Sequence, residues 1–325
     1  MDAAAASGEP IALDVELSRL TADVVCRTIF SIPLESELAA AVFRDFEVFQ
    51  ATVANVRLGR LLLGRPFADA PQPKPARMAA ARIRQAIADL LAPRRAPGAA
   101  PLDDLAGDLI AARDPETGDG FTETELIDQL AVFFLAGHET TASAVSWALV
   151  LLHGDPDYAD RCRAESDAAA ATDAPIAVDQ TKRMRVVHNL LRESMRLYPP
   201  GPFLPRVARA AGELGGRRFR RGTMIMISPW IIHRHPAYWP DADRFDPSRF
   251  EPGSPHAGRP GAYLPFGLGP RACVGAGFAT LEGATILARL LKRYFVSLTS
   301  LETIRPTAKL TIRPDAPIWG EVARR

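Results

Sequence analysis

The residues best suited to chemistry surround Cys273, in the segment PFGLGPRACVGAG. A thiolate is a good iron ligand, and the positive end of a helix that starts here would help it stay ionised. Gly267 and Gly269 carry no side chain, so a flat group could approach the backbone closely. Arg271 could pair with an anionic group on its edge. The alternative is a buried structural cysteine at the start of a helix.

A second polar group interrupts an apolar stretch at LAGHETTAS, residues 135–143. His138 and Glu139 begin the zinc motif H-E-x-x-H, but Ala142 stands where the second histidine is needed. Polar residues buried here would be costly unless they are hydrogen-bonded or functional. A threonine hydroxyl turned onto the helix carbonyls could loosen the helix and make room for a small ligand. The alternative is a polar break in a buried helix.

Glu193 and Arg196 have a spacing that places both charges on one face of a helix. Alone this pair indicates little, because such pairs are common on solvated helix faces. The helix around it is apolar, however, and LYPPGP follows. Further along, residues 233–270 are rich in proline and lack periodicity. A long irregular segment inside a compact domain usually has a function.

The cysteine segment resembles the haem-binding signature of the cytochrome P-450 superfamily, F-x-x-G-x-R-x-C-x-G. Every fixed position is filled, by Phe266, Gly269, Arg271, Cys273 and Gly275. The resemblance implies that the cofactor is haem b and that the Cys273 thiolate is the axial ligand of its iron. It also implies that the other four residues contact the cofactor.

The same family carries [AG]-G-x-[DE]-T-[TS] in the middle of its long central helix. Here the motif is filled by Ala136, Gly137, Glu139, Thr140 and Thr141. The resemblance implies that Glu139 and Thr140 form an acid–alcohol pair that relays protons to iron-bound oxygen. It places Ala136 and Gly137 against the cofactor.

The family's E-x-x-R motif matches Glu193 and Arg196, and Arg249 of FDPSRF completes it. Ser248 stands where the family commonly has glutamate. The resemblance implies that this charged triad is structural and fixes the cysteine loop, and it gives the triad no catalytic role.

In PFLPRVARA, Arg206 matches the place of an arginine that binds a haem propionate, and Arg209 is a nearby competitor. The alternative for both is a solvated arginine on a strand. His233 and His235 of HRHP are typical of the family's β lobe. We interpret them as structural residues, not as metal ligands.

Composition excludes several other classes of protein. The chain has 325 residues, enough for a large core, and its net charge of +1 gives no reason to expect a nucleic-acid partner. Three distant cysteines argue against a disulfide framework and for a reducing compartment, so a cytoplasmic protein is expected. The first residues lack the basic and apolar regions of a signal peptide. No clean apolar segment of about 18 residues occurs, so no membrane anchor is expected.

Periodicity and turn residues predict a mostly helical part over 1–198, a β lobe with a Pro-rich meander over 199–272, and a last helix with closing strands over 273–325. A capping box, Thr122-x-x-Glu125, should open a long helix that ends near Leu152. The other expected helices cover 15–30, 37–56, 76–92, the residues after GDPDY, 184–197 and 273–294. A turn followed by a strand is expected in RRFRRGTMIMIS, and closing strands are expected in FVSLTS and KLTIRP.

The predicted fold class is therefore mainly α with a small β lobe. The resemblance runs from about Leu13 to the C-terminus. It implies one cytochrome P-450 domain, 1–325, that lacks the family's first helices and part of its sheet.

The implied function is a bacterial-type haem monooxygenase that inserts one atom of O2 into a mostly apolar organic substrate. A ferredoxin- or flavodoxin-type donor with its reductase would supply the electrons. The alternatives are an inactive, haem-poor remnant and a helical binding module. A peroxide-driven or isomerase variant is a third, against which the Glu139–Thr140 pair weighs.

Overall fold

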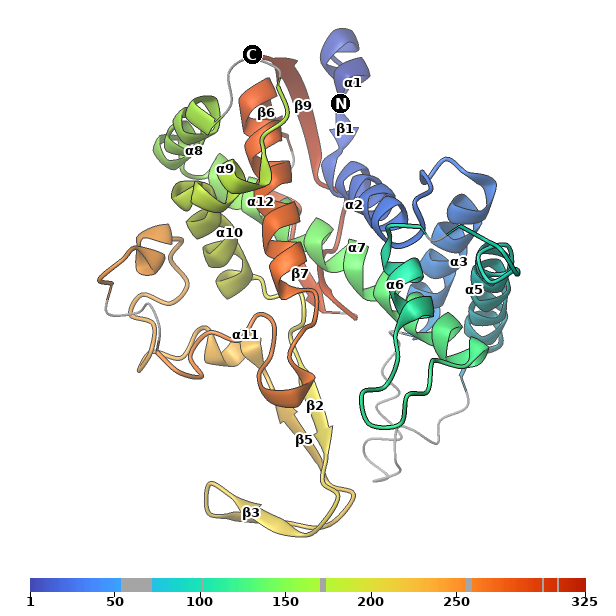
Figure 1. Ribbon diagram of the computed structural model, residues 1–325. Helices are drawn as coiled ribbons and strands as arrows, with labels where there is room; N and C mark the ends of the chain where they lie inside the picture. The colour runs from blue at the N-terminus through green and yellow to red at the C-terminus, as the bar shows by residue number, and fades with distance from the viewer. Residues whose placement is uncertain (54–71, 101, 170–173, 255–258, 300, 309) are drawn as a thin grey trace. The chain divides into compact units, whose positions relative to one another are not determined.

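The computed structural model describes residues 1–53, 72–100, 102–169, 174–254, 259–299, 301–308 and 310–325. They form two compact units. The helical unit comprises Ser18–Glu139, and the mixed unit comprises Met1–Leu17 and Thr140–Arg325. Helices dominate and the sheets are small, so the predicted fold class is confirmed (Figure 1). Among the described residues, no helix combines the length and apolarity needed to cross a bilayer.

The helical unit is built from amphipathic helices around one apolar core. They are α2 (Leu13–Phe30, from Ser18 on), α3 (Glu37–Val53), α5 (Lys74–Leu91), α6 (Leu105–Ala111) and the first half of α7 (Glu123–His153). Helices α3 and α5 pack along each other, and Phe30, Phe46, Ile87, Leu130 and Phe134 are buried between the helices. The predicted helices 15–30, 37–56 and 76–92 are confirmed, except that 54–56 lie outside the described residues.

Helix α7 begins with the predicted capping box. The Thr122 N–H donates to Oε2 of Glu125 at 2.9 Å, and the Glu125 N–H donates to Oγ1 of Thr122 at 3.3 Å. These bonds satisfy amide groups that the first helical turn leaves without a partner. The helix then continues to His153 without a break. This continuous helix, with the polar residues 138–141 inside it, confirms the predicted long helix ending near Leu152.

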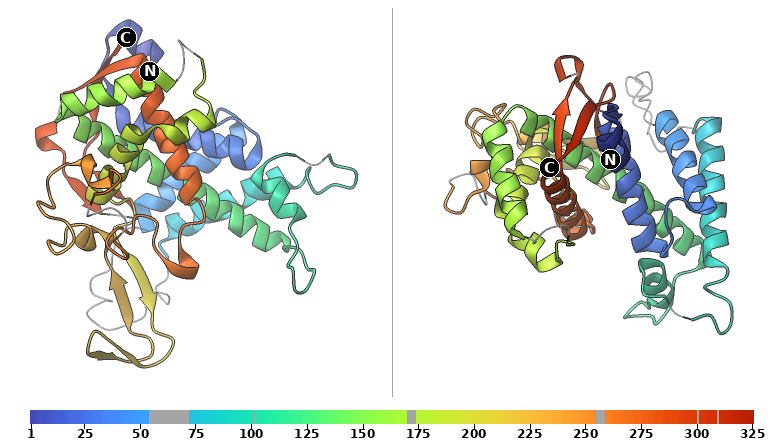
Figure 2. Two further views of the ribbon diagram at one scale, coloured as in Figure 1. Left: turned by 60° about the vertical axis from the view of Figure 1, so that its left-hand side comes forward. Right: turned by 90° about the horizontal axis from the view of Figure 1, so that it is seen from above.

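The mixed unit holds its helices around α12 (Ala276–Arg293), which lies beside α8 (Pro156–Ala169), α9 (Val178–Arg183) and α10 (Arg185–Leu197) (Figures 1 and 2). Close approach requires Gly283 on α12, because a Cβ there would lie 3.0 Å from Cδ2 of Leu191. Two short helices, α1 (Asp2–Ser7) and α11 (Pro229–Ile232), complete the set. Helix α12 begins three residues after the predicted start at Cys273.

Four small antiparallel sheets belong to the mixed unit. The first has the order β1 (Ile11–Ala12), β9 (Trp319–Arg324), β6 (Tyr294–Leu298), with Val296 opposite Val322. The others pair β2 (Leu204–Val207) with β5 (Met224–Ile227), β3 (Gly212–Leu214) with β4 (Arg217–Phe219), and β7 (Pro306–Ala308) with β8 (Ile312–Pro314). RRFRRGTMIMIS was predicted as a turn and one strand; it forms β5 after a turn, and its first three residues form the additional strand β4.

The predicted closing strands are confirmed in part. FVSLTS contributes most of β6, and KLTIRP forms β8 only with its last three residues. Ser300 and Lys309 lie outside the described residues.

Candidate functional site

The loop that carries Cys273 has a shape that only glycine adopts readily at two positions. Gly267 and Gly269 have φ angles of 70° and 73°, in the left-handed region. The Cys273 N–H donates to the carbonyl oxygen of Phe266 at 2.8 Å and closes the loop. Cys273 comes two residues before Gly275, the N-cap of α12, so its thiol sits just ahead of that helix.

Cys273 differs from the other two cysteines in exposure. Cys26 and Cys162 are buried, and burial raises the pKa of each thiol to about 12. Such thiols stay protonated and are poor metal ligands. Cys273 is exposed, and its sulfur has no hydrogen-bond partner among the described residues. The alternative of a buried structural cysteine is therefore wrong for Cys273.

The surroundings of the Cys273 thiol fit a flat, mostly apolar group with an acidic edge. Leu268, Val274 and Phe278 expose 61%, 83% and 41% of their surface. These three apolar residues lie within five positions of Cys273 in the chain, and a flat apolar group bound there could cover them. Arg271 is exposed and forms no ion pair with any described residue. Haem has both the apolar face and the carboxylate edge that these residues suit.

Strand β2 brings Arg206 to the same region. Leu204 and Arg206 share one face of the strand, because side chains alternate along it. A Cβ on Gly267 would lie 3.8 Å from Cδ1 of Leu204, so this face of β2 lies against the cysteine loop. Arg206 is half-buried, and its guanidinium donates to the carbonyl oxygen of Pro205 at 2.9 Å. Arg209 is exposed beyond the strand, which favours Arg206 as the anion-binding residue.

The central-helix motif is divided between the two units. Thr140 is half-buried and belongs to the mixed unit with Cys273, whereas the buried Glu139 ends the helical unit. Within the helical unit, a Cβ on Gly137 would lie 3.0 Å from Cγ2 of Val25. This contact gives Gly137 a packing role against α2. Its predicted contact with the cofactor, and that of the exposed Ala136, stay predictions.

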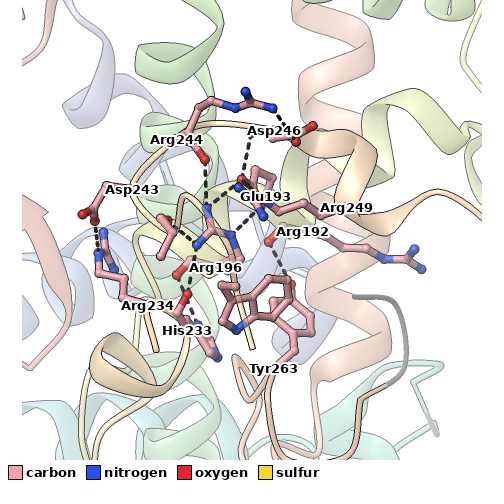
Figure 3. A network of polar contacts seen from close by, with 12 residues as sticks. Arg192, Glu193, Arg196, His233, Arg234, Asp243, Arg244, Asp246, Arg249 and Tyr263 are labelled. Carbon is pink, nitrogen blue, oxygen red and sulfur yellow. Dashed lines mark hydrogen bonds and ion pairs between the residues drawn. The ribbon is translucent and has the colours of Figure 1, made fainter. Parts of the chain in front are cut away.

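The predicted E-x-x-R pair is a fully buried ion pair on α10 (Figure 3). Nε of Arg196 donates to Oε2 of Glu193 at 2.7 Å, and its Nη2 donates to Oε1 at 2.8 Å. The same guanidinium donates to the carbonyl oxygens of His233, Ala242 and Arg244 at 2.9, 2.6 and 3.1 Å. One buried cation therefore fixes three points of the irregular segment that precedes the cysteine loop.

Arg249 joins this pair as predicted. It lies in the short 3-10 helix η2 (Pro247–Phe250), and its Nε is 3.6 Å from Oε1 of Glu193. Its Nη2 donates to the carbonyl oxygen of Asp241 at 3.0 Å. The Asp246 N–H also donates to Oε1 of Glu193, at 2.9 Å. Burial raises the pKa of the Glu193 carboxyl, and the hydrogen bonds from Arg196 and Asp246 oppose that shift.

His233 connects the ion pair to the cysteine loop. Its Nδ1–H donates to the carbonyl oxygen of Arg196 at 3.2 Å, and its Nε2 accepts the Leu264 N–H at 2.7 Å. Leu264 in turn accepts the Gly267 N–H at 3.2 Å. Burial lowers the pKa of His233 to about 4, so its ring is neutral and can accept this bond. The structural interpretation of His233 fits this geometry, although its specific bond to Leu264 was not predicted from the sequence.

A second link runs beside it. The Tyr263 hydroxyl donates to the carbonyl oxygen of Arg192 on α10 at 3.0 Å (Figure 3). His235 is exposed, and its Nδ1 accepts the Ala237 N–H at 3.2 Å, which is a local turn contact. The residues immediately before the loop are therefore attached to α10 at two places. A tyrosine directly preceding LPFG is the signal that could have suggested the second link.

Comparison with known proteins identifies the family. The family model "Cytochrome P450" matches residues 1–318. Cyclooctatin synthase of Streptomyces melanosporofaciens is 32% identical over 311 residues, which are 93% of this chain and 66% of the relative. Cyclooctat-9-en-7-ol 5-monooxygenase of the same organism is 38% identical over 214 residues, covering 66% of this chain and 46% of the relative.

More distant organisms and solved structures agree with this. Human Cytochrome P450 4V2 is 32% identical over 220 residues, 67% of this chain and 42% of that protein. The crystal structure of the cytochrome P450DA heme domain superposes with a TM-score of 0.86 at 25% identity, covering 100% of this chain and 70% of that one. The matches thus span from 42% to 66% of the length of these curated relatives.

Removing one partner of the buried Glu193–Arg196 ion pair should strongly destabilise the folded chain. Glu193→Ala leaves the Arg196 guanidinium buried without its counter-ion, at a cost of about 3–5 kcal/mol in unfolding free energy. Chemical denaturation and soluble yield measure this loss. Glu213→Ala, which removes an exposed carboxylate from a loose 3.8 Å ion pair with Arg218, is the matched control and should change stability by less than about 0.5 kcal/mol. A soluble Glu193→Ala chain with an unchanged denaturation midpoint would contradict the structural role.

The neutral ring of His233 predicts a pH dependence of stability. Its folded pKa of about 4 is below the ordinary 6.5, so the unfolded chain binds more protons between these values. The contribution of His233 to the unfolding free energy is fully present above pH 6.5. It declines as the pH falls toward 4, by at most about 1.4 kcal/mol per pH unit. Denaturation midpoints of the wild type and His233→Gln, measured across that range, should converge on acidification. If both chains showed the same slope, the neutral state assigned to His233 would be wrong. His235→Gln is the control, because His235 is exposed.

Proposed function

Because this chain belongs to the cytochrome P450 family, we propose that it is a haem-dependent monooxygenase that inserts one oxygen atom of O2 into a mostly apolar organic substrate. The observation that carries the proposal is the exposed Cys273 thiol, on a loop fixed by the buried Glu193–Arg196 pair through His233. Members of the family use haem b, iron protoporphyrin IX. When bound, the haem supplies the activation of O2 and the oxidation of the substrate.

The chain's own residues would hold the cofactor in named ways. The Cys273 sulfur is the proposed iron ligand, and it lies just ahead of the first turn of α12. The glycines of the loop let the flat ring approach the backbone. Arg271 and Arg206 would pair with the acidic edge of the ring. Phe266, Gly269, Gly275, Ala136 and Gly137 remain proposed contacts.

Proton delivery is proposed for Glu139 and Thr140. Glu139 is buried, so its carboxyl can hold a proton away from bulk water, and Thr140 follows it on the same helix. A hydroxyl can accept a proton from one neighbour while it donates its own to another, which suits it to transfer. The pair would therefore pass protons toward the reacting oxygen without exposing the site to solvent. An enzyme driven by peroxide or an isomerase would have less need of this relay.

The substrate and electron donor follow from the relatives. One relative's name gives cyclooctat-9-en-7-ol as the compound on which it acts as a monooxygenase, which supports a mostly apolar substrate here. We propose a ferredoxin- or flavodoxin-type donor with its reductase as the source of electrons, because members of the cytochrome P450 family depend on a redox partner. The cytoplasmic location and bacterial type stay predictions.

The alternative proposal is a haem-poor remnant or a helical binding module. Haem content separates the two proposals. A purified chain that binds no haem when haem is supplied would support the remnant or a helical binding module.

Replacing the proposed iron ligand tests the function directly. Cys273→Ser should abolish the thiolate-type absorption of the reduced carbonyl complex, because an alcohol is a much weaker electron donor than a thiolate. The spectrum of the haem-loaded chain measures this. Cys26→Ser and Cys162→Ser are the controls and should retain the band, since both thiols are buried and protonated. Survival of the band in Cys273→Ser would refute the assignment.

The relay predicts a separate effect on efficiency. Thr140→Ala should keep its haem but yield less product per electron, with the difference appearing as hydrogen peroxide or water, because protons arrive at the wrong position or time. Product, peroxide and electron-donor consumption are measured together. Thr122→Ala, which alters only the exposed start of α7, should leave the ratio unchanged. An unaltered yield per electron in Thr140→Ala would exclude the relay role.

A further inference from the structure

Helix α12 carries a buried carboxyl group to which the proposed function assigns no role. Glu282 exposes only 7% of its surface. Neither of its carboxyl oxygens forms a hydrogen bond of good geometry with any described residue. The side chain faces Thr141 on α7, whose hydroxyl is the polar group that acts on it. A buried carboxyl with so few partners requires an explanation.

Among the residues that the structure describes, no charged side chain acts on the Glu282 carboxyl. On α8, Glu165 accepts the backbone N–H groups of Val186 and Val187, and on α10 Glu193 and Arg196 bind each other. The charged side chains of α9 are exposed: Asp179, Lys182 and Arg183. On β6, the Tyr294 hydroxyl donates to Asp2. None of these groups acts on the Glu282 carboxyl.

An ionised Glu282 would therefore be a buried, uncompensated charge, which proteins avoid by keeping the group neutral. Burial raises the pKa of Glu282 to about 8, and the Thr141 hydroxyl opposes this shift only in part. A neutral carboxyl keeps a carbonyl oxygen that can accept from the Thr141 hydroxyl, so the contact does not need a buried charge.

The geometry connects this acid to the central helix. Glu282 faces Thr141, and a Cβ on its neighbour Gly283 would lie 3.6 Å from Cγ2 of Val145, one turn further along α7. Two consecutive residues of α12 thus meet two residues one turn apart on α7. Thr141 follows Thr140 directly, and α12 begins at the cysteine loop.

We propose that Glu282 is a positioning residue that stays protonated and holds α12 to the Thr140–Thr141 turn of α7, so that losing its proton weakens the packing of these two helices. The contact itself depends only on the fold. Its consequence for the reaction, a fixed placement of Thr140 relative to the helix behind Cys273, rests on the proposed function.

Infrared spectroscopy of the full chain tests the protonation state without haem or turnover. At pH 6 the wild type should show the carbonyl stretch of a protonated carboxyl group, and Glu282→Gln should lack it. Raising the pH through 8 should remove the band in the wild type. Thr141→Val removes the opposing hydroxyl and should move this titration to higher pH. The proposal is overturned if Glu282→Gln leaves the spectrum at pH 6 unchanged, or if Thr141→Val does not move the titration.

Stability provides a second readout. The folded pKa of Glu282 is above its ordinary 4.5, so the folded chain binds more protons between pH 4.5 and 8. Across that range the wild type should lose stability relative to Glu282→Gln, and the ratio of their unfolding constants should change by up to about tenfold per pH unit. A ratio that is independent of pH overturns the proposal. Glu302→Gln, in the exposed turn before β7, is the matched control.

Failure of the proposed function would be seen separately. If Cys273→Ser kept the thiolate-type spectrum while the Glu282 band titrated as described, the haem assignment would be wrong and the Glu282 contact would stand. If the spectrum behaved as expected and the Glu282 band were absent, only this inference would be lost.

Discussion

The arrangement of the mixed unit depends on one buried guanidinium. Arg196 has five N–H donors, and each has an acceptor: two on the Glu193 carboxylate and three on backbone carbonyl oxygens of the segment 233–244. That segment has few ladder hydrogen bonds of its own, so its buried carbonyl groups need side-chain donors. Lysine, with three donors on a point charge, could not make this set of bonds. The Arg196 guanidinium thereby supplies hydrogen bonds to carbonyl groups of this segment that a helix or strand would otherwise satisfy.

The cysteine loop receives its position from this centre through neutral groups. The imidazole of His233 accepts the Leu264 N–H, and Leu264 accepts the Gly267 N–H. His233 can accept the Leu264 N–H only while its ring is uncharged. Burial beside Arg196 keeps the ring uncharged. The left-handed glycines then turn the chain and present the Cys273 sulfur to the outside. The position of the loop thus depends on hydrogen bonds that lead back through His233 to α10.

The sequence was most informative where a feature depends on close spacing. The capping box at Thr122, the helix ends and the pair Glu193–Arg196 each involve residues three or four apart, which local geometry brings together. Arg249 was found only through the resemblance, because 53 positions separate it from Arg196. The bond from Leu264 to His233 spans 31 positions and leaves no pattern in one sequence.

Short strands such as β1 and β9 were missed for the same reason: their pairing partners lie at opposite ends of the chain. Two residues of β1 carry no period, and their hydrogen bonds appear only when Ile11 meets Gly320. The long helix α7 was predicted in full, because its capping box and its apolar residues are local signals that the polar residues 138–141 do not remove.

Glu193 and Glu282 show how environment gives one residue type two different states. Both carboxyls are buried in the same unit, and burial raises the pKa of each. Glu193 accepts hydrogen bonds from Arg196 and Asp246 and forms an ion pair with Arg249, so its negative charge is compensated. Among the described residues, the Thr141 hydroxyl is the one polar group that acts on Glu282, and a neutral acid suits that site better. Its position was visible in the sequence, since Phe278 and Ile286 lie four residues to either side, on one face of α12. A glutamate on an apolar helical face is a sign of a buried acid, and whether that acid carries charge is decided by which donors the rest of the fold brings to it.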